Sequence, residues 1–526
     1  MKPEGVLLFG DSRCAWRIAE RLTVAGVPVA ISAPDPELSP PSGYRAAPAG
    51  APLEALPGTR LLSCRGATGD FEVRLARGTE RLVRRVKAVV VACREEAIPR
   101  LPDSGLAALP AVQPLSRFRT DAFPPQPEGA PLPVVVFLDG LVREGRPDIS
   151  GRVMGFALEL ESRRSARSFI LCGNLKVAGE GLEALAHRAR SAGVRFFKFE
   201  GRRPAFRPLP DGRIEIRFTD PATGEAFNLA ADVVVAEEVA CPPAAAAEIA
   251  AVLGLERDPA GFLQSENVHR LPVFTNRRGI VVAGPVRLAG SDPELEAENA
   301  VLAVLENLGR EVDPQAAAAI DPGRCIRCLT CLRLCTYRAI ALEEERPRVL
   351  FPACERCGIC AAECPREAIR LEGLDRSGLL RLLDPPSEAA PSEAPRITVF
   401  ACSRSAAPAL REARAAGLPV PALLRLVELP CAGALAPEVI RTAFSRGADG
   451  VLVLTCHEGN CHSRHGNLLA GRRAEEMRAF LERVGLDGGR IAWATLAANM
   501  PGEAAAAIAR LAEALRPQGD AKGSLR

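Results

Sequence analysis

The sequence has almost no net charge and no long apolar run, and each absence excludes a class of protein. Its 67 basic and 64 acidic side chains give a formal net charge of +3, so the chain as a whole lacks the basic footprint of a nucleic-acid-binding or membrane-surface protein. No apolar stretch approaches the about 18 residues of a membrane span, and the one before Asp11 is too short for a signal-peptide core. The sequence therefore predicts a soluble, cytoplasmic protein without a membrane span or nucleic-acid partner.

Cysteine, by contrast, is abundant, with 17 in the chain. The cytosol keeps thiols reduced, so a disulfide framework is not expected and metal ligation is the leading interpretation. Eight of the cysteines crowd into 325–364 and four more follow at wide intervals. The remaining five show no common pattern and are interpreted as small buried apolar residues: Cys14, Cys64, Cys93, Cys172 and Cys241.

The crowded cysteines form two copies of one pattern, C-x2-C-x2-C-x3-C, at Cys325, Cys328, Cys331 and Cys335 and at Cys354, Cys357, Cys360 and Cys364. In bacterial ferredoxins the first three cysteines of a run hold one 4Fe–4S cluster, and the fourth crosses to the other cluster. The pattern therefore predicts a first cluster on Cys325, Cys328, Cys331 and Cys364, and a second on Cys335, Cys354, Cys357 and Cys360. A pair of zinc sites is the alternative, although zinc modules usually pair two C-x2-C hooks.

The last four cysteines follow expected strands of a small parallel α/β domain. Strand-like runs cover 397–400, 423–429, 451–454 and 491–494, and the carboxyl ends of parallel strands share one edge where ligands bind. The thiols could therefore converge on one site and complete the ligand set of a 2Fe–2S cluster, with free buried cysteines as the alternative. They are Cys402, Cys431, Cys456 and Cys461.

The segment GADGVLVLTCHEGNCHSRHGN, with CAG upstream, resembles the delta iron-sulfur subunit of F420-non-reducing hydrogenase. The resemblance covers about 397–515 and implies a 2Fe–2S cluster on those four cysteines. Ser405 departs from the family, which has a second cysteine there, and this puts the full ligand set around Cys402 in doubt. His457, His462 and His465 are interpreted either as hydrogen-bonding partners of the sulfurs or as ordinary surface histidines.

The N-terminal residues predict a strand, a turn, a helix and a second strand within 5–31. Gly10, Ser12 and Ala15 stand where a dinucleotide-binding turn has Gly, Gly and Gly or Ala, and Ser12 weakens that fingerprint. Ser32 and Ala33 replace the expected acid after the second strand. A βαβ scaffold without a nucleotide is the alternative.

Two further segments, FILCGNLKVAGEGLEALAHRARSAGVRFFKFEG and NVHRLPVFTNRRGIVVAGP, lie ahead of the ferredoxin pattern and resemble the A-type chain of heterodisulfide reductase over about 130–374. That family implies FAD, with Gly279 and Gly284 in the late strand as further candidate contacts, although Pro285 replaces an acid. The fusion of both parts resembles the B-type chain of the quinone-interacting membrane-bound oxidoreductase complex. The resemblance implies other subunits of a redox complex as partners and attachment to a membrane complex through them.

We therefore expect an α/β chain whose parts are a degenerate dinucleotide-binding region (1–125), a heterodisulfide reductase A-like region (130–315), a two-4Fe–4S ferredoxin domain (316–374), a linker (375–396), a 2Fe–2S domain (397–517) and a disordered tail (518–526). Three functions are open at this point. The first is an electron-transfer subunit that relays electrons between the clusters and a partner. The second is an FAD-dependent oxidoreductase that splits electron pairs, and the third is a zinc-containing scaffold.

Overall fold

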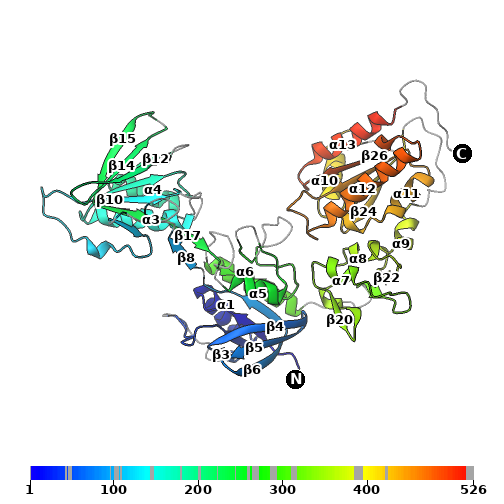
Figure 1. Ribbon diagram of the computed structural model, residues 1–526, viewed down its shortest axis with the longest axis horizontal. Coiled ribbons are helices and arrows are strands. Elements are labelled where there is room, and N and C mark those ends of the chain that lie inside the picture. The colour runs from blue at the N-terminus through cyan, green and yellow to red at the C-terminus, as the bar shows by residue number, and fades with distance from the viewer. Residues whose placement is uncertain are drawn as a thin grey trace.

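The computed structural model describes residues 2–41, 44, 50–94, 96–99, 106, 109, 111–141, 147–177, 181–199, 203–221, 223–242, 245–257, 261–263, 272–284, 293–309, 317–383, 395–420 and 424–516. Figure 1 shows a first α/β domain between two other groups of elements. One group is a second α/β domain, and the other is a C-terminal α/β domain with a small cysteine-rich segment beside it. The predicted α/β class with parallel sheets is confirmed. Among the described residues, no helix has both the length and the apolar character needed to cross a membrane.

The first domain is built on a five-stranded parallel sheet in the order β18-β7-β1-β2-β3. Its central strands are buried on both faces, as the apolar runs of a covered parallel sheet require. The strands are β1 (Val6–Phe9), β2 (Val29–Ser32), β3 (Leu53–Leu56), β7 (Ala88–Val91) and β18 (Ile280–Val282).

Each face of this sheet has its own apolar core. Val6 and Leu8 pack toward helices α1 (Arg13–Val24) and α6 (Pro293–Gly309). Leu7 and Phe9 point the opposite way, as alternate residues of a strand do, toward helix α5 and an antiparallel sheet. Those elements are α5 (Ala246–Leu253), β4 (Thr59–Ala67), β5 (Asp70–Arg77) and β6 (Glu80–Val86).

The second domain repeats this plan with a parallel sheet in the order β12-β11-β10-β16-β9. Two helices cover one face and an antiparallel sheet, β13-β14-β15, covers the other. A short ribbon of β8 and β17 connects the two domains. The bounds are β8 (Glu96–Pro99), β9 (Val112–Pro114), η1 (Thr120–Ala122), β10 (Val134–Asp139), α3 (Pro147–Ser162), β11 (Arg167–Cys172), α4 (Leu182–Ser191), β12 (Arg195–Lys198), β13 (Ala205–Pro208), β14 (Ile214–Thr219), β15 (Ala226–Ala231), β16 (Val233–Ala236) and β17 (Glu238–Cys241).

The chain returns to the first domain after the second one is complete, which corrects the expected division at 130–315. Strand β18 pairs with β7, and helix α6 packs on α1. The second domain is thus inserted between two parts of the first. Strand order along the sequence does not predict this, because the residues of β7 that pair with β18 lie 191 positions earlier in the chain.

The cysteine-rich segment, residues 317–374, is small and has little regular structure. It contains two short antiparallel ribbons, β19 with β22 and β20 with β21, and two one-turn helices. The bounds are β19 (Ala319–Ile320), α7 (Thr330–Leu334), β20 (Ile340–Glu343), β21 (Arg346–Val349), η4 (Phe351–Ala353), α8 (Ile359–Ala362) and β22 (Ile369–Arg370).

The C-terminal domain has a four-stranded parallel sheet in the order β24-β23-β25-β26. Helices α11 and α12 pack on one face, and α10 and α13 pack on the other. The bounds are β23 (Ile397–Cys402), α10 (Ala406–Ala415), β24 (Leu424–Leu429), η5 (Ala432–Ala434), α11 (Pro437–Ser445), β25 (Gly450–Thr455), α12 (Gly466–Arg483), η6 (Gly488–Arg490), β26 (Ile491–Thr495) and α13 (Pro501–Ala514).

The expected linker at 375–396 is partly wrong, because its first residues form helix α9 (Arg376–Arg381). Asp375 caps this helix, and Leu379 and Leu383 are buried in the core of the C-terminal domain. Arg425 donates a hydrogen bond to the Leu383 carbonyl at 2.5 Å. The rest of the linker up to residue 394, and the tail expected at 518–526, lie outside the described residues.

Candidate iron-sulfur centres

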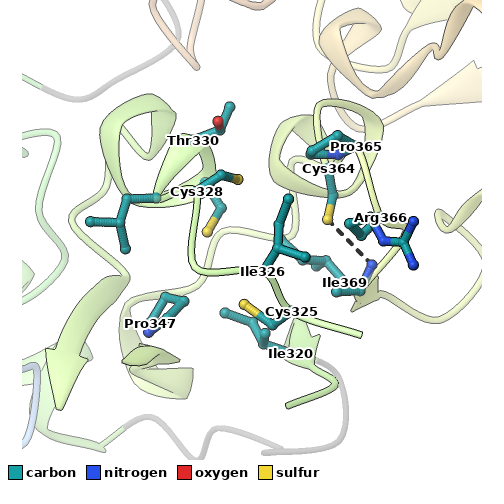
Figure 2. Close-up of a pocket in the computed structure, with 13 residues that line it drawn as sticks. Ile320, Cys325, Ile326, Cys328, Thr330, Pro347, Cys364, Pro365, Arg366 and Ile369 are labelled. Carbon is teal, nitrogen blue, oxygen red and sulfur yellow. Dashed lines mark hydrogen bonds between the residues drawn. The ribbon is translucent and has the colours of Figure 1, made fainter. Parts of the chain in front are cut away.

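One pocket of the cysteine-rich segment, here the first pocket, brings together three cysteines of the first run and the last cysteine of the second. Figure 2 shows Cys325, Cys328 and Cys364 around it, and Cys331 also lines it. The Ala368 N–H donates to the Cys364 sulfur at 3.2 Å. A hydrogen bond with Thr330 lowers the pKa of the exposed Cys328 thiol, which favours the thiolate that binds iron.

The remaining four cysteines line the second pocket: Cys335, Cys354, Cys357 and Cys360. The Ala339 N–H donates to the Cys335 sulfur at 3.3 Å. Burial raises the pKa of Cys357 to about 12, so iron binding here would release thiol protons. No three described Cys, His, Asp or Glu side chains converge closely enough to hold a single metal ion; the thiols of each pocket surround a volume instead.

The two halves of the segment repeat one backbone conformation. Residues two and four positions after the first cysteine of each run have positive φ: Arg327 and Leu329 in one half, Arg356 and Gly358 in the other. Left-handed backbone costs non-glycine residues roughly 1–2 kcal/mol each, so three of the four positions are strained. Such strain persists only where the surroundings enforce it, which is typical of ligand-binding loops.

The four cysteines of the C-terminal domain, here the thiol site, also come together. The sulfurs of Cys402 and Cys456 are 3.5 Å apart, and Cys461 makes side-chain hydrogen bonds with both Cys431 and Cys456. All four thiols are buried. A Cβ atom on Gly466 would lie only 2.1 Å from the Cys431 sulfur, so the first residue of helix α12 has to be glycine for the thiols to fit.

Contacts between these thiols shift their pKa values in opposite directions. The hydrogen bond with Cys456 lowers the pKa of Cys402, and the one with Cys431 lowers the pKa of Cys461. The same contacts, together with burial, raise the pKa of Cys431 and Cys456. A set of four buried thiols that contact one another has the donor chemistry of an iron-sulfur site.

Two serines hydrogen-bond to the thiols, and one of them stands at the position where the sequence departs from the delta-subunit family. Ser405, in place of the family's further cysteine, donates a hydrogen bond to the Cys456 sulfur at 3.4 Å. Ser463 makes a hydrogen bond with Cys431 and gave no signal in the sequence. The ring nitrogens of His457 instead contact Thr495 Oγ1 and Met500 Sδ, at 2.8 and 3.3 Å, so both are occupied by partners other than the four cysteines of the thiol site.

The second pocket and the thiol site are in direct contact. A Cβ on Gly358, which lines the second pocket, would lie 2.6 Å from Ala434 Cβ, three residues after Cys431. The charge of Cys357 contributes to the raised pKa of Cys431. Tyr337, another residue of the second pocket, shares a hydrogen bond of 2.8 Å with Ser463. The sequence could not indicate these contacts, because they join segments about 75 to 125 positions apart.

The candidate FAD residues are only partly brought together. Gly10, Ser12 and Gly284 meet at the carboxyl edge of the first sheet, where a Cβ on Gly284 would lie 3.6 Å from Ser12 Oγ. Ala15 is next to them, and its N–H donates to Ser12 Oγ at 3.1 Å. Gly279 lies at the opposite edge, where its missing Cβ makes room for Thr68. Pro285 lies outside the described residues.

The described side chains at this edge do not fit FAD. Ser12 caps α1, where a dinucleotide needs close approach of its pyrophosphate to the backbone. The adjacent Asp11, 3.0 Å from Arg94, adds a carboxylate at this edge, which disfavours an anionic ligand. Glu296, which is 3% exposed, accepts the Gly284 N–H at 2.6 Å. Glu296 thus uses a backbone N–H at this edge that an anionic ligand could otherwise accept from.

Comparison with known proteins agrees with the geometry of the cysteine-rich segment. Residues 317–365 match the 4Fe-4S dicluster domain, and residues 397–519 match the delta subunit of methyl-viologen-reducing hydrogenase. The chain therefore contains a domain of the 4Fe-4S dicluster type.

Its C-terminal domain is similar to the D-type iron-sulfur chain of F420-non-reducing hydrogenase from Archaeoglobus profundus. The two are 35% identical over 97 residues, which are 18% of this chain and 71% of that protein. Through this domain the chain belongs to the family of hydrogenase delta-type iron-sulfur subunits.

A longer part of the chain is similar to the A-type chains of heterodisulfide reductases. The A-type chain of ferredoxin:CoB-CoM heterodisulfide reductase from Methanosarcina mazei is 27% identical over 326 residues, 60% of this chain and 40% of that protein. The chain thus spans 40% of the length of this relative. The predicted combination of a heterodisulfide reductase A-like region with a delta-subunit domain is confirmed. Among solved structures, T. acidophilum thioredoxin reductase aligns with a TM-score of 0.36 at 14% identity, over 59% of this chain and 98% of that one.

Proposed function

We propose that the chain is an electron-transfer subunit of an anaerobic redox complex, with a 2Fe–2S cluster in the thiol site and a 4Fe–4S cluster in each pocket. When bound, these clusters supply one-electron chemistry at sulfur-ligated iron. The first cluster would be held by Cys325, Cys328, Cys331 and Cys364. The second would be held by Cys335, Cys354, Cys357 and Cys360, and the 2Fe–2S cluster by Cys402, Cys431, Cys456 and Cys461.

The observation that carries this proposal is the contact between the second pocket and the thiol site. The two sites belong to different domains, yet Gly358 and Ala434 leave no room for a further methyl group between them. A zinc-binding scaffold has no need for such closeness, whereas electron transfer depends on it. The protein's part is to hold the second pocket and the thiol site in contact and to bury the four thiols of the thiol site.

The heterodisulfide reductase and hydrogenase subunits that resemble this chain support partners of the same kind. We propose that other subunits of such a complex deliver and receive the electrons, in a reducing compartment such as the cytoplasm, where free thiols persist. Attachment to a membrane would go through those partners. The rival function is electron-pair splitting on FAD by this chain. The carboxylates of Asp11 and Glu296 and the helix cap Ser12, at the edge where FAD would bind, do not support it.

The test is cofactor analysis of protein purified without oxygen. Three clusters would give about ten iron atoms per chain, and a stepwise reductive titration should bleach the visible absorption in more than one phase. A colourless protein with stoichiometric zinc would overturn the proposal and support a scaffold. Iron near eight atoms, with loss of the features of one cluster type, would remove only the 2Fe–2S assignment.

A further inference from the structure

The internal repeat of the cysteine-rich segment creates two equivalent faces, one beside each pocket. Counted from the cysteines, Leu329 corresponds to Gly358, Thr330 to Ile359 and Arg366 to Tyr337. The matching positive φ of Leu329 and Gly358, at +59° and +81°, supports this correspondence. The hydrogen bonds that the Ala339 and Ala368 N–H groups donate to the fourth cysteine of each run also support this correspondence.

The face of the second pocket is covered by the C-terminal domain. Gly358 packs on Ala434 there, and Ile359 lies 2.9 Å from the place of a Cβ on Gly433. The Tyr337 hydroxyl forms a hydrogen bond with the Ser463 hydroxyl. Glycine is required at 358 because of this close approach, in addition to its backbone conformation.

The face of the first pocket has no such cover in the described structure. Leu329 occupies the position equivalent to Gly358. The close backbone approach that requires glycine at the second pocket is therefore not made at the first pocket by the described residues. Ile326 is 60% exposed, and Cys328 is an exposed thiol. The ion pair beside this pocket, between Arg370 and Asp321, stays within the cysteine-rich segment. Figure 2 shows Ile326, Cys328 and Arg366 around the pocket.

Arginines surround this face. Arg366 lines the pocket, Arg333 donates to the Cys328 carbonyl at 3.1 Å, and Arg324 and Arg327 flank Ile326 in the chain. All four are exposed. Two carboxylates close to these arginines in the chain are paired with other arginines: Asp321 lies 3.7 Å from Arg370, and Glu367 pairs with Arg376 at 2.5 Å. The face is therefore locally positive in a chain that is nearly neutral overall.

We propose that this face, centred on Ile326 and Cys328 and surrounded by Arg324, Arg327, Arg333 and Arg366, is the docking surface for an acidic electron-carrier protein. An apolar centre within a charged rim is typical of transient protein interfaces, and opposite charge speeds and orients such encounters. This inference rests on the proposed function. It adds an order of the centres along the electron path: the thiol site and the second pocket are the internal centres, and the first pocket faces the partner. A docked carrier would exchange one electron with the first cluster. One centre is oxidised and the other reduced by that electron, and no bond is made or broken.

The test is direct binding of a small acidic ferredoxin in its oxidised form, measured by calorimetry on anaerobically purified protein at several salt concentrations. Wild type should bind, and binding should weaken as salt screens the charges. Arg327→Glu with Arg366→Glu should weaken binding at low salt by about tenfold or more and reduce its salt dependence. The neutral pair, R327Q with R366Q, should lie between the two.

The matched control is Arg414→Glu with Arg510→Glu, the same change of charge on exposed residues of α10 and α13. It should bind like wild type. Equal weakening by the control and the test pair, or salt-independent binding by wild type, overturns the docking surface. Concentration-dependent dimerisation that disappears in R327E/R366E would overturn it too and assign the face to a second copy. Iron analysis of each sample separates these outcomes from failure of the proposed function, in which wild type itself lacks iron.

Discussion

Arg473 of helix α12 and Glu363 of the cysteine-rich segment form an ion pair across the boundary between the C-terminal domain and the second pocket. Arg473 is 3% exposed and also donates to the carbonyls of Gly433 and Leu435, at 2.9 and 2.7 Å. Glu363 precedes Cys364, and Gly433 follows Cys431 by two positions. One guanidinium thus ties a loop of the thiol site to the segment that carries both pockets.

Replacing Arg473 with Met should loosen this boundary while leaving both folded parts intact. Removing one partner of a buried ion pair typically costs about 3–5 kcal/mol, and because Glu363 is 22% exposed we expect the lower end of that range. Hydrogen exchange should become faster in α8 and η5. The magnetic coupling between the reduced centres, read by electron paramagnetic resonance, should weaken at unchanged iron content.

Arg483→Met, an exposed arginine at the end of the same helix, is the control and should leave exchange and coupling unchanged. Glu363→Gln keeps a hydrogen-bond acceptor and should give a smaller effect than R473M. Unchanged coupling in R473M would show that other contacts, such as Tyr337 with Ser463, hold the boundary by themselves.

Gly466→Ala should destroy the thiol site selectively. The added methyl would lie 2.1 Å from the Cys431 sulfur, far inside van der Waals contact, so that thiol has to move and the ligand set is broken. We expect iron to fall from about ten to about eight atoms per chain, with the 4Fe–4S signals kept. Gly502→Ala in α13, where a Cβ meets nothing within 4 Å, is the control. Full iron content in G466A would contradict the assignment of Cys431 as a ligand.

The sequence predicted the elements that repeat a local pattern, and it missed those that depend on distant partners. The buried run at Val6–Phe9 and the strands before Cys402 and Cys456 were predicted, because apolar runs and turn residues mark them. The antiparallel sheets β4-β5-β6 and β13-β14-β15 were missed, although β5 alternates buried and exposed residues. The eight cysteines of 325–364 were predicted from their spacing, and the four later ones from their positions after predicted strands and from the resemblance to the hydrogenase delta subunit.

What could not be predicted at the site is the set of residues that join the domains. Arg473, Tyr337 and Ser463 are ordinary residue types, and their roles come from contacts formed only in the folded chain. One signal was available in retrospect. Gly358 stands where the other half of the repeat has Leu329, and a glycine at only one of two equivalent positions indicates a close neighbour on that side.

The first sheet should not bind FAD. Ser12, Asp11 and Glu296 occupy the edge where its pyrophosphate would lie, so we expect no flavin fluorescence in the supernatant of denatured protein and no saturable quenching on titration with FAD. Ser12→Ala should instead act on folding, with a loss of about 1 kcal/mol for the helix cap. One FAD per purified chain would contradict this and restore the flavin enzyme as a candidate function.

The proposed crossed ligation of the two clusters can be tested by comparing the electron paramagnetic resonance spectra of cysteine variants. Cys364 lies in the first pocket with Cys328, although its own run of cysteines lines the second, and Cys335 lies in the second with Cys357. Cys364→Ser should therefore give the same paramagnetic resonance change as Cys328→Ser, and Cys335→Ser the same change as Cys357→Ser. Each change should affect one cluster, because the other keeps four thiolates. Variants that group by position along the chain, with C364S like C357S and C335S like C328S, would show that the fourth cysteines do not cross.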